Sequence, residues 1–175
     1  EAINIVFVSV LLNLVFNVIL FFIILIFKQT IVRFLNISTE FQNYIYFVPL
    51  GTFLFSFYQS LNHWLIRRGK FVAISKNKFI RRGSEGITQV SFQFLNKTFG
   101  LIIGDIIGHI ANVISGIYFS VKSGLKLSLI SIVKVKYILR KYIEYPKFNV
   151  IPSLMSACSY LFPTLIINKY YSPQI

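Results

Sequence analysis

The chain has 175 residues, of which 55% are hydrophobic and 13% are charged, and its mean hydropathy is +0.70. A soluble domain carries roughly 25% charged residues, so a water-exposed globular protein fits this composition poorly. Intrinsic disorder is excluded by the abundance of apolar residues. We therefore expect an all-α polytopic membrane protein, and at roughly 20 residues per span the length allows about five transmembrane helices.

The first part of the chain contains two long stretches without Lys, Arg, Asp or Glu. Residues 2–27 would reach about 39 Å as a helix, which is enough to cross a hydrocarbon core of about 30 Å. This run is also too long for the apolar core of a signal peptide. Residues 41–66 form the second predicted span, in which Pro49 and Gly51 are expected to mark a kink.

Most of the positive charge falls in two stretches, residues 67–82 and 122–147. Together they hold 14 of the 18 Lys and Arg residues, in a chain with a net charge of +13. The positive-inside rule predicts that both are cytoplasmic loops. In a membrane protein an excess of Lys and Arg indicates contact with anionic lipid headgroups, so no nucleic-acid partner is expected.

Two segments on the same side of a membrane must be joined by an even number of crossings. We therefore predict a helix over residues 76–96 that begins after an N-cap at Ser75, followed by a returning helix over residues 101–121. The cations of the first helix would lie among the lipid headgroups and extend towards water. These cations are Lys76, Lys78, Arg81 and Arg82.

The rest of the chain predicts two more helices. Residues 126–141 alternate apolar and basic side chains, which is typical of an amphipathic helix on the cytoplasmic surface. Residues 150–168 form a fifth predicted span, interrupted by Pro152 and Pro163. Residues 1–175 would thus be one transmembrane region whose first residue faces the cytoplasm.

Two of the predicted spans carry regularly spaced polar residues. Ser9, Asn13 and Asn17 recur at steps of four, and a longer stripe follows in residues 41–66. Polar groups that face lipid are costly, so these faces should contact other helices or line a pathway for a polar solute. The longer stripe consists of Thr52, Ser56, Gln59, Ser60 and His63. It ends at Arg67 and Arg68, which could bind phosphate or could serve only to orient the chain.

The predicted helix 101–121 carries two further patterns. Glycines at positions 100, 104, 108 and 116 are typical of a face that lets another helix approach closely. Asp105 and His109 lie four residues apart on a neighbouring face. An ionisable pair at membrane depth indicates an ion relay, and the alternative is a locally paired carboxylate near the outer surface.

No known enzyme template is present. The sequence contains neither HExxH nor a phosphate-binding P-loop nor GxSxG. We therefore predict no catalytic residue, no metal site and no cofactor, and do not expect an enzyme. The one cysteine, Cys158, lies in an apolar segment and is expected to be a buried small hydrophobic residue.

Several stretches resemble lipid-linked oligosaccharide flippases, the Wzx-like O-antigen exporters of the MOP superfamily. The first is Gln-Ser-Leu-Asn-His-Trp-Leu-Ile-Arg-Arg-Gly-Lys-Phe at residues 59–71. The others are residues 84–94 followed by Gly-Leu-Ile-Ile-Gly-Asp-Ile-Ile-Gly-His at 100–109, Tyr-Pro-Lys-Phe at 145–148, and the proline-bounded segment 152–163. The resemblance implies an internal fragment that corresponds to about the third to seventh helices of a transporter with 12 to 14 helices.

The resemblance also implies a function and a location. The protein would move undecaprenyl-diphosphate-linked oligosaccharide across the bacterial plasma (inner) membrane for O-antigen, capsule or exopolysaccharide biosynthesis. Its partners would be this substrate, membrane lipids and the remaining helices of the transporter. The polar stripes would line the substrate pathway, with Asn13, Asn17, Thr52, Ser56, Gln59 and His63 facing the sugars and Arg67 and Arg68 meeting the diphosphate.

Two other functions remain open. A drug or cation antiporter of the same superfamily would need a membrane-embedded acid, for which Asp105 is the candidate. A structural subunit of a membrane complex would need none of these polar residues for transport.

Overall fold

A computed structural model describes residues 2–35, 37, 41–94, 99–126, 128, 130–142 and 144–170 of the chain. Over these residues the fold is entirely helical, which confirms the predicted all-α class. Two of the helices, α1 and α4, are long and apolar enough to cross a membrane. The elements are α1 (Ala2–Phe34), the 3-10 helix η1 (Gln42–Phe47), α2 (Val48–Arg67), α3 (Phe71–Phe94), α4 (Gly100–Lys122), α5 (Ile132–Lys141) and α6 (Glu144–Tyr170).

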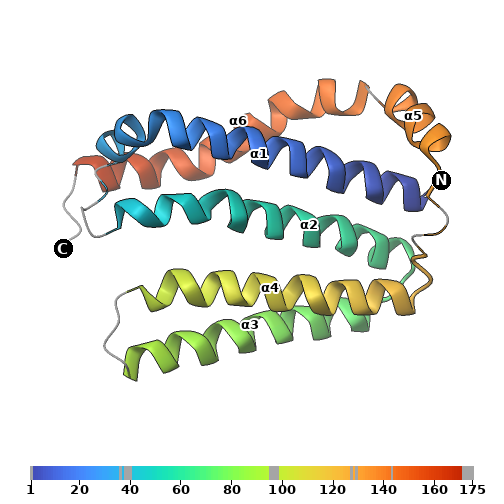
Figure 1. The fold of residues 1–175 in the computed structure, drawn as a ribbon, viewed down its shortest axis with the longest axis horizontal. Helices are drawn as coiled ribbons and strands as arrows, with labels where there is room; N and C mark the ends of the chain where they lie inside the picture. The colour runs from blue at the N-terminus through green and yellow to red at the C-terminus, as the bar shows by residue number, and fades with distance from the viewer. Residues whose placement is uncertain are drawn as a thin grey trace.

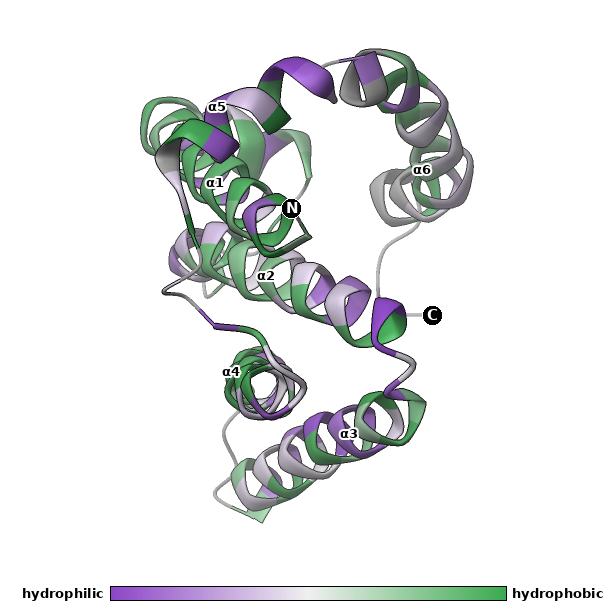
Figure 2. Cartoon of the chain, turned by 90° about the vertical axis from the view of Figure 1, so that its right-hand side faces the viewer, coloured by the Kyte–Doolittle hydropathy of each residue, from purple (hydrophilic) through white to green (hydrophobic). Residues whose placement is uncertain are grey.

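Four long helices lie side by side in the order α1, α2, α4, α3 (Figure 1). Helix α2 runs against α1, and α4 returns against α3. One end of this bundle, which we call the basic end, contains the start of α1, the end of α2, the start of α3, the end of α4, and α5. Both basic stretches of the sequence therefore begin at the same end of the bundle. Figure 2 shows that α3 is markedly more hydrophilic than α1.

Glycines end two helices at the basic end. Gly69 follows α2 with φ of 65°, and Gly124 follows α4 with φ of 95°. At α2 the Lys70 N–H donates to Leu65 O and the Gly69 N–H donates to Ile66 O, both at 2.9 Å. The same two bonds follow α4, from the Leu125 N–H to Ser120 O and from the Gly124 N–H to Val121 O, both at 3.0 Å. This pair of bonds is the Schellman motif, in which glycine adopts the left-handed conformation without a steric penalty.

The cap at Gly69 also explains a wrong prediction. Only Lys70 separates this cap from Phe71, where α3 begins, so Ser75 lies inside the helix and is not its N-cap. Most of the stretch predicted as a basic loop, residues 67–82, is therefore helical. The helix that was predicted over 76–96 starts about one turn earlier.

Other boundaries also differ from prediction. The helix predicted over residues 126–141 begins only at Ile132, and the span predicted over residues 150–168 is part of a longer helix, Glu144–Tyr170. Helix α1 continues to Phe34 through a local distortion at Phe27, beyond the predicted end at residue 27. The predicted span 41–66 is divided into η1 and α2, and Pro49 lies in the first turn of α2. Proline has no N–H to lose there, so Pro49 starts the helix and does not kink it.

Helix α6 lies apart from the four-helix bundle (Figure 2). It runs through Pro152 and Pro163, and its side chains that the structure describes are exposed. Cys158 is exposed as well, which contradicts the predicted burial. The reason is that α6 does not pack extensively on the other helices of the described chain.

The core of the bundle at the basic end is apolar. Its buried side chains come from α2, α3 and the segment after α4, and Leu65 is fully buried. The cluster, which we call the apolar plug, consists of Leu61, Trp64, Leu65, Ile74 and Leu125.

Candidate functional site

Helices α3 and α4 form a tightly packed antiparallel pair. A Cβ atom at Gly104 would lie 2.5 Å from Gln89 Cγ and 3.3 Å from the Glu85 carbonyl oxygen. At Gly108 it would lie 3.0 Å from Glu85 Cβ and 3.3 Å from the Arg81 carbonyl oxygen. The predicted close-packing face of glycines is thus confirmed, and at Gly104 and Gly108 it meets both side-chain and backbone atoms of α3.

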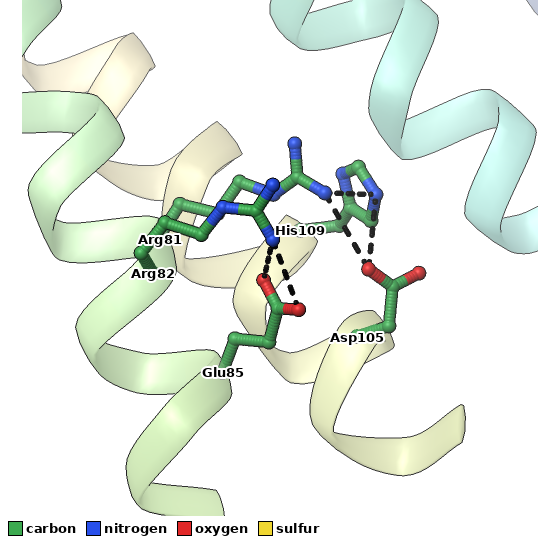
Figure 3. A network of polar contacts seen from close by, with 5 residues as sticks. All are labelled: Arg81, Arg82, Glu85, Asp105 and His109. Atoms are coloured by element: carbon green, nitrogen blue, oxygen red, sulfur yellow. Dashed lines mark hydrogen bonds and ion pairs between the residues drawn. The ribbon is translucent and has the colours of Figure 1, made fainter. Parts of the chain in front are cut away.

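This packing brings Arg81 of α3 to the predicted Asp105–His109 pair of α4 (Figure 3). Arg81 Nη2 lies 3.0 Å from His109 Nε2 and 3.4 Å from Asp105 Oδ1. His109 Nε2 is 3.6 Å from the same carboxylate oxygen. The side chain of Asp105 is half exposed, whereas His109 is buried. We call these three residues the charged triad.

Arg81 and Arg82 do not extend towards the basic end as predicted. Arg81 reaches Asp105 and His109, which lie towards the opposite end of α4, because the carboxylate and the imidazole there accept hydrogen bonds from its guanidinium group. Arg82 Nη1 bonds both carboxylate oxygens of Glu85, at 3.1 and 2.9 Å, within α3. Two of the four cations predicted to lie among headgroups, Arg81 and Arg82, thus have carboxylate partners within the α3–α4 pair.

Asp105 also lies on the wall of a cavity of about 630 Å³ at the end of the bundle opposite the basic end. The cavity lies between η1, the start of α2 and the start of α4. Thr52 also lines it, and most of the other lining residues are apolar. This end of the bundle therefore has a mainly apolar cavity with one half-exposed carboxylate, that of Asp105, on its wall.

The predicted polar stripes of α1 and α2 face each other. Asn17 Nδ2 donates to Asn13 Oδ1 at 2.7 Å, and Thr52 donates to Asn17 Oδ1 at 2.5 Å. Asn13 Nδ2 donates to the Phe53 carbonyl oxygen at 3.0 Å. The hydroxyl groups of Ser9 and Ser60 are bonded to each other. These residues therefore form interhelical hydrogen bonds, one of the two roles predicted for them.

The other predicted pathway residues are not gathered at one point. Ser56 and Gln59 are half-buried, and His63 and Arg67 are exposed on α2. Ser56 accepts a bond from Ser60 through its carbonyl oxygen at 3.1 Å. Arg68 places its guanidinium 4.7 Å from the centre of the Trp64 ring.

Cations from both basic stretches meet at the basic end. A pocket of about 280 Å³ is lined by Lys70 and Lys76 from the first stretch and by Lys122 and Ser123 from the second. Trp64 of α2 donates through Nε1 to Ser123 Oγ at 2.8 Å, which ties this pocket to the apolar plug. We call these four residues the lysine pocket.

Neither a family model nor a curated protein nor a solved structure matches this chain. Within the residues that the structure describes, no group of three or more His, Cys, Asp or Glu side chains could hold a metal ion.

Sequence reasoning missed the buried amides between the helices. Asn77 and Asn112 are fully or almost fully buried, and neither was singled out as functional. The burial of Asn112 could have been predicted from its spacing, since it lies midway between Gly108 and Gly116 on the close-packing face. The lysine pocket was missed because its members are separated by about 50 residues of sequence.

Proposed function

We propose that this chain is a membrane-embedded part of a flippase that moves undecaprenyl-diphosphate-linked oligosaccharide across the bacterial plasma membrane. The basic end would face the cytoplasm, where the substrate is made. Transport would change no covalent bond of the substrate. The remaining helices of a full transporter would supply the second half of the pathway.

The observation that carries this proposal is the lysine pocket. Lys70, Lys76 and Lys122 come from separate basic stretches and line one hollow, with Arg68 nearby on Trp64. A diphosphate carries several negative charges and accepts hydrogen bonds from ammonium and guanidinium groups. Such a cluster at the cytoplasmic interface would recognise the diphosphate common to all substrates, whatever their sugars.

The experiment is complementation of a bacterial strain that lacks its own flippase with the full-length protein. Replacing Lys70, Lys76 and Lys122 together by Gln should abolish surface polysaccharide and leave lipid-linked oligosaccharide in the cytoplasmic leaflet. The matched control replaces Lys134, Lys136 and Lys141 of α5 by Gln, with the same loss of charge outside the pocket. Equal transport by both triple variants would contradict the proposal.

A cation antiporter is the second candidate, favoured by the position of Asp105. Its half-exposed carboxylate lies on the wall of the 630 Å³ apolar cavity, which suits a lipophilic cation. Under this function Asp105→Asn would abolish efflux of such a cation. Under the flippase function the same variant would leave diphosphate binding at the lysine pocket intact.

A further inference from the structure

A groove of about 170 Å³ lies between α1 and α4, near the basic end of the bundle. Helix α2 lies between these two helices in Figure 1, and it supplies part of the lining. Two residues that follow α4, Leu125 and Ile130, complete it. All the residues that line this space in the described part of the chain are apolar. We call it the apolar groove.

The apolar groove is closed on one side and open on the other. Leu61 of α2 and Leu125 are buried and also belong to the apolar plug, so they form the floor. Phe7 of α1 and Val121 of α4 line the groove as well but are exposed, so they form the rim. Helices α1 and α4 are the two that are long and apolar enough to cross a membrane. In a bilayer the open side would therefore face lipid.

The shape of the groove suits a single extended chain. Its lining runs along α1 from Ile3 to Val10, which is about 10 Å of helix. A volume of 170 Å³ over this length leaves a cross-section of about 17 Å². That is about the width of one methylene chain, because carbon atoms in contact lie about 3.5–4.0 Å apart.

Water is a poor occupant for this space. A buried water molecule needs several polar partners, and an apolar cavity of roughly 150 Å³ in another protein stays dry and binds small hydrocarbons. The described lining of the apolar groove offers no polar side chain. An empty groove would lose the dispersion contacts of its walls, and a hydrocarbon chain would restore them.

Positive charge lies at the basic end of the groove. Lys126 directly follows the lining residue Leu125 and is exposed. Arg68 Nη2 lies 3.8 Å from the position that a Cβ atom would take at Gly124, the residue before Leu125. Basic side chains at the edge of a membrane attract anionic lipids. The charge at this end thus complements a lipid phosphate.

We propose that the apolar groove binds one acyl chain of an anionic phospholipid from the leaflet at the basic end. The chain lies between α1 and α4, and the phosphate lies beside Lys126 and Arg68. The bound chain bridges α1 and α4, which both pack on α2. This inference does not rest on the flippase function, since the lysine pocket is formed with α3 and the groove with α1.

Trp64 is a native reporter for this site. It is the only tryptophan in these 175 residues, and it is buried against Leu61 and Leu125, which form the floor of the groove. Bromine quenches tryptophan fluorescence only at short range, so a brominated chain in the groove should quench Trp64. The protein is placed in phosphatidylcholine vesicles with a small fraction of phosphatidylglycerol, brominated in the part of the chain nearest the headgroup. Any tryptophan outside these residues is replaced by Phe.

The first comparison uses the unmodified protein and two lipids. Quenching by brominated phosphatidylglycerol should saturate at a low fraction of this lipid. The same fraction of brominated phosphatidylcholine should quench several-fold less, because it has no net negative charge for Lys126 and Arg68 to attract. Quenching by phosphatidylcholine that is equal or stronger would overturn the proposal. So would the absence of quenching by either lipid, which would mean that no lipid chain enters the groove.

The second comparison fills the groove from α1 with Val6→Phe. Quenching by brominated phosphatidylglycerol should then fall several-fold. Val15→Phe, the same change at an exposed position of α1 outside the groove, should be quenched like the unmodified protein. Equal quenching of the two variants would place the lipid elsewhere and overturn the site. An unchanged emission maximum of Trp64 shows that the plug is intact, and the comparison of the two lipids does not depend on either variant.

Discussion

The indole Nε1 of Trp64 donates a hydrogen bond of 2.8 Å to Ser123 Oγ, which joins the last turn of α2 to the residue that follows α4. The bond lies between the buried apolar plug and the lysine pocket. It therefore fixes the position of the cations relative to the core, across 59 residues of sequence.

Removing this bond should destabilise the bundle by about 1 kcal/mol. Trp64→Phe keeps an aromatic ring in the plug, and Ser123→Ala removes the acceptor. The two changes should be strongly non-additive in a double-mutant cycle, because both remove the same interaction. The free energy of unfolding in mixed micelles measures this effect. Additive changes would show that the bond contributes nothing.

The bond between Asn17 and Thr52 should stabilise the contact between α1 and α2. Asn17→Leu removes the amide that bonds Asn13 and Thr52, and we expect a loss of about 1 kcal/mol, within the range measured for polar contacts between membrane helices. The control is Val18→Leu at the neighbouring exposed position. Unfolding in mixed micelles should show a loss for Asn17→Leu and none for the control.

Gly104→Ala should weaken the contact between α3 and α4 by about 1–3 kcal/mol, because the new methyl group would lie 2.5 Å from Gln89 Cγ. Gly86→Ala in α3 is the matched control, since a Cβ atom there meets nothing within 4 Å. Alanine has the higher helix propensity, so Gly86→Ala should leave stability unchanged or raise it. Equal effects at the two positions would contradict the packing described here.

Arg81→Gln should destabilise the protein by about 1–3 kcal/mol, because it leaves Asp105 without its cation. Water partly screens the half-exposed carboxylate, which keeps the loss small. The double variant Arg81→Gln/Asp105→Asn should recover part of the loss, since it removes both charges. Unfolding free energies of both single variants and of the double variant test this. A double variant less stable than either single variant would argue against the pairing.

The two basic stretches should be accessible from the same side of the membrane. In a Cys158→Ser background, Lys78→Cys and Lys126→Cys should both react with an impermeant thiol reagent from the cytoplasmic face. Phe94→Cys, at the opposite end of α3, should react only from the other face. Opposite reactivity at residues 78 and 126 would undo the predicted number of crossings.

Local chemistry made several features predictable. Uncharged runs predicted α1 and the helical part of residues 41–66, and glycine spacing predicted the close-packing face of α4. The start of α3 was placed wrongly at Ser75, because serine is a good N-cap but the turn at Gly69 had already reversed the chain. Helix boundaries depend on the competing turn as well as on the cap.

The partners of the polar residues were less predictable. Asp105 and His109 were paired from their spacing within one helix, but Arg81 lies 24 residues from Asp105. Its approach depends on the contact of Gly108 with the backbone of α3. Likewise, both roles predicted for Asn13 and Asn17 were compatible with their spacing, and the position of α2 decided that they bond across the helix interface.

By itself, the sequence determined that the chain is helical and strongly apolar, and where its cations lie along it, because composition and periodicity are local properties. The tertiary structure decided that Lys70, Lys76 and Lys122 line one pocket and that Arg81 turns towards Asp105. It also decided that Asn112 is buried without a partner in the described chain. These relationships depend on the register between helices, which is set by contacts that are remote in sequence.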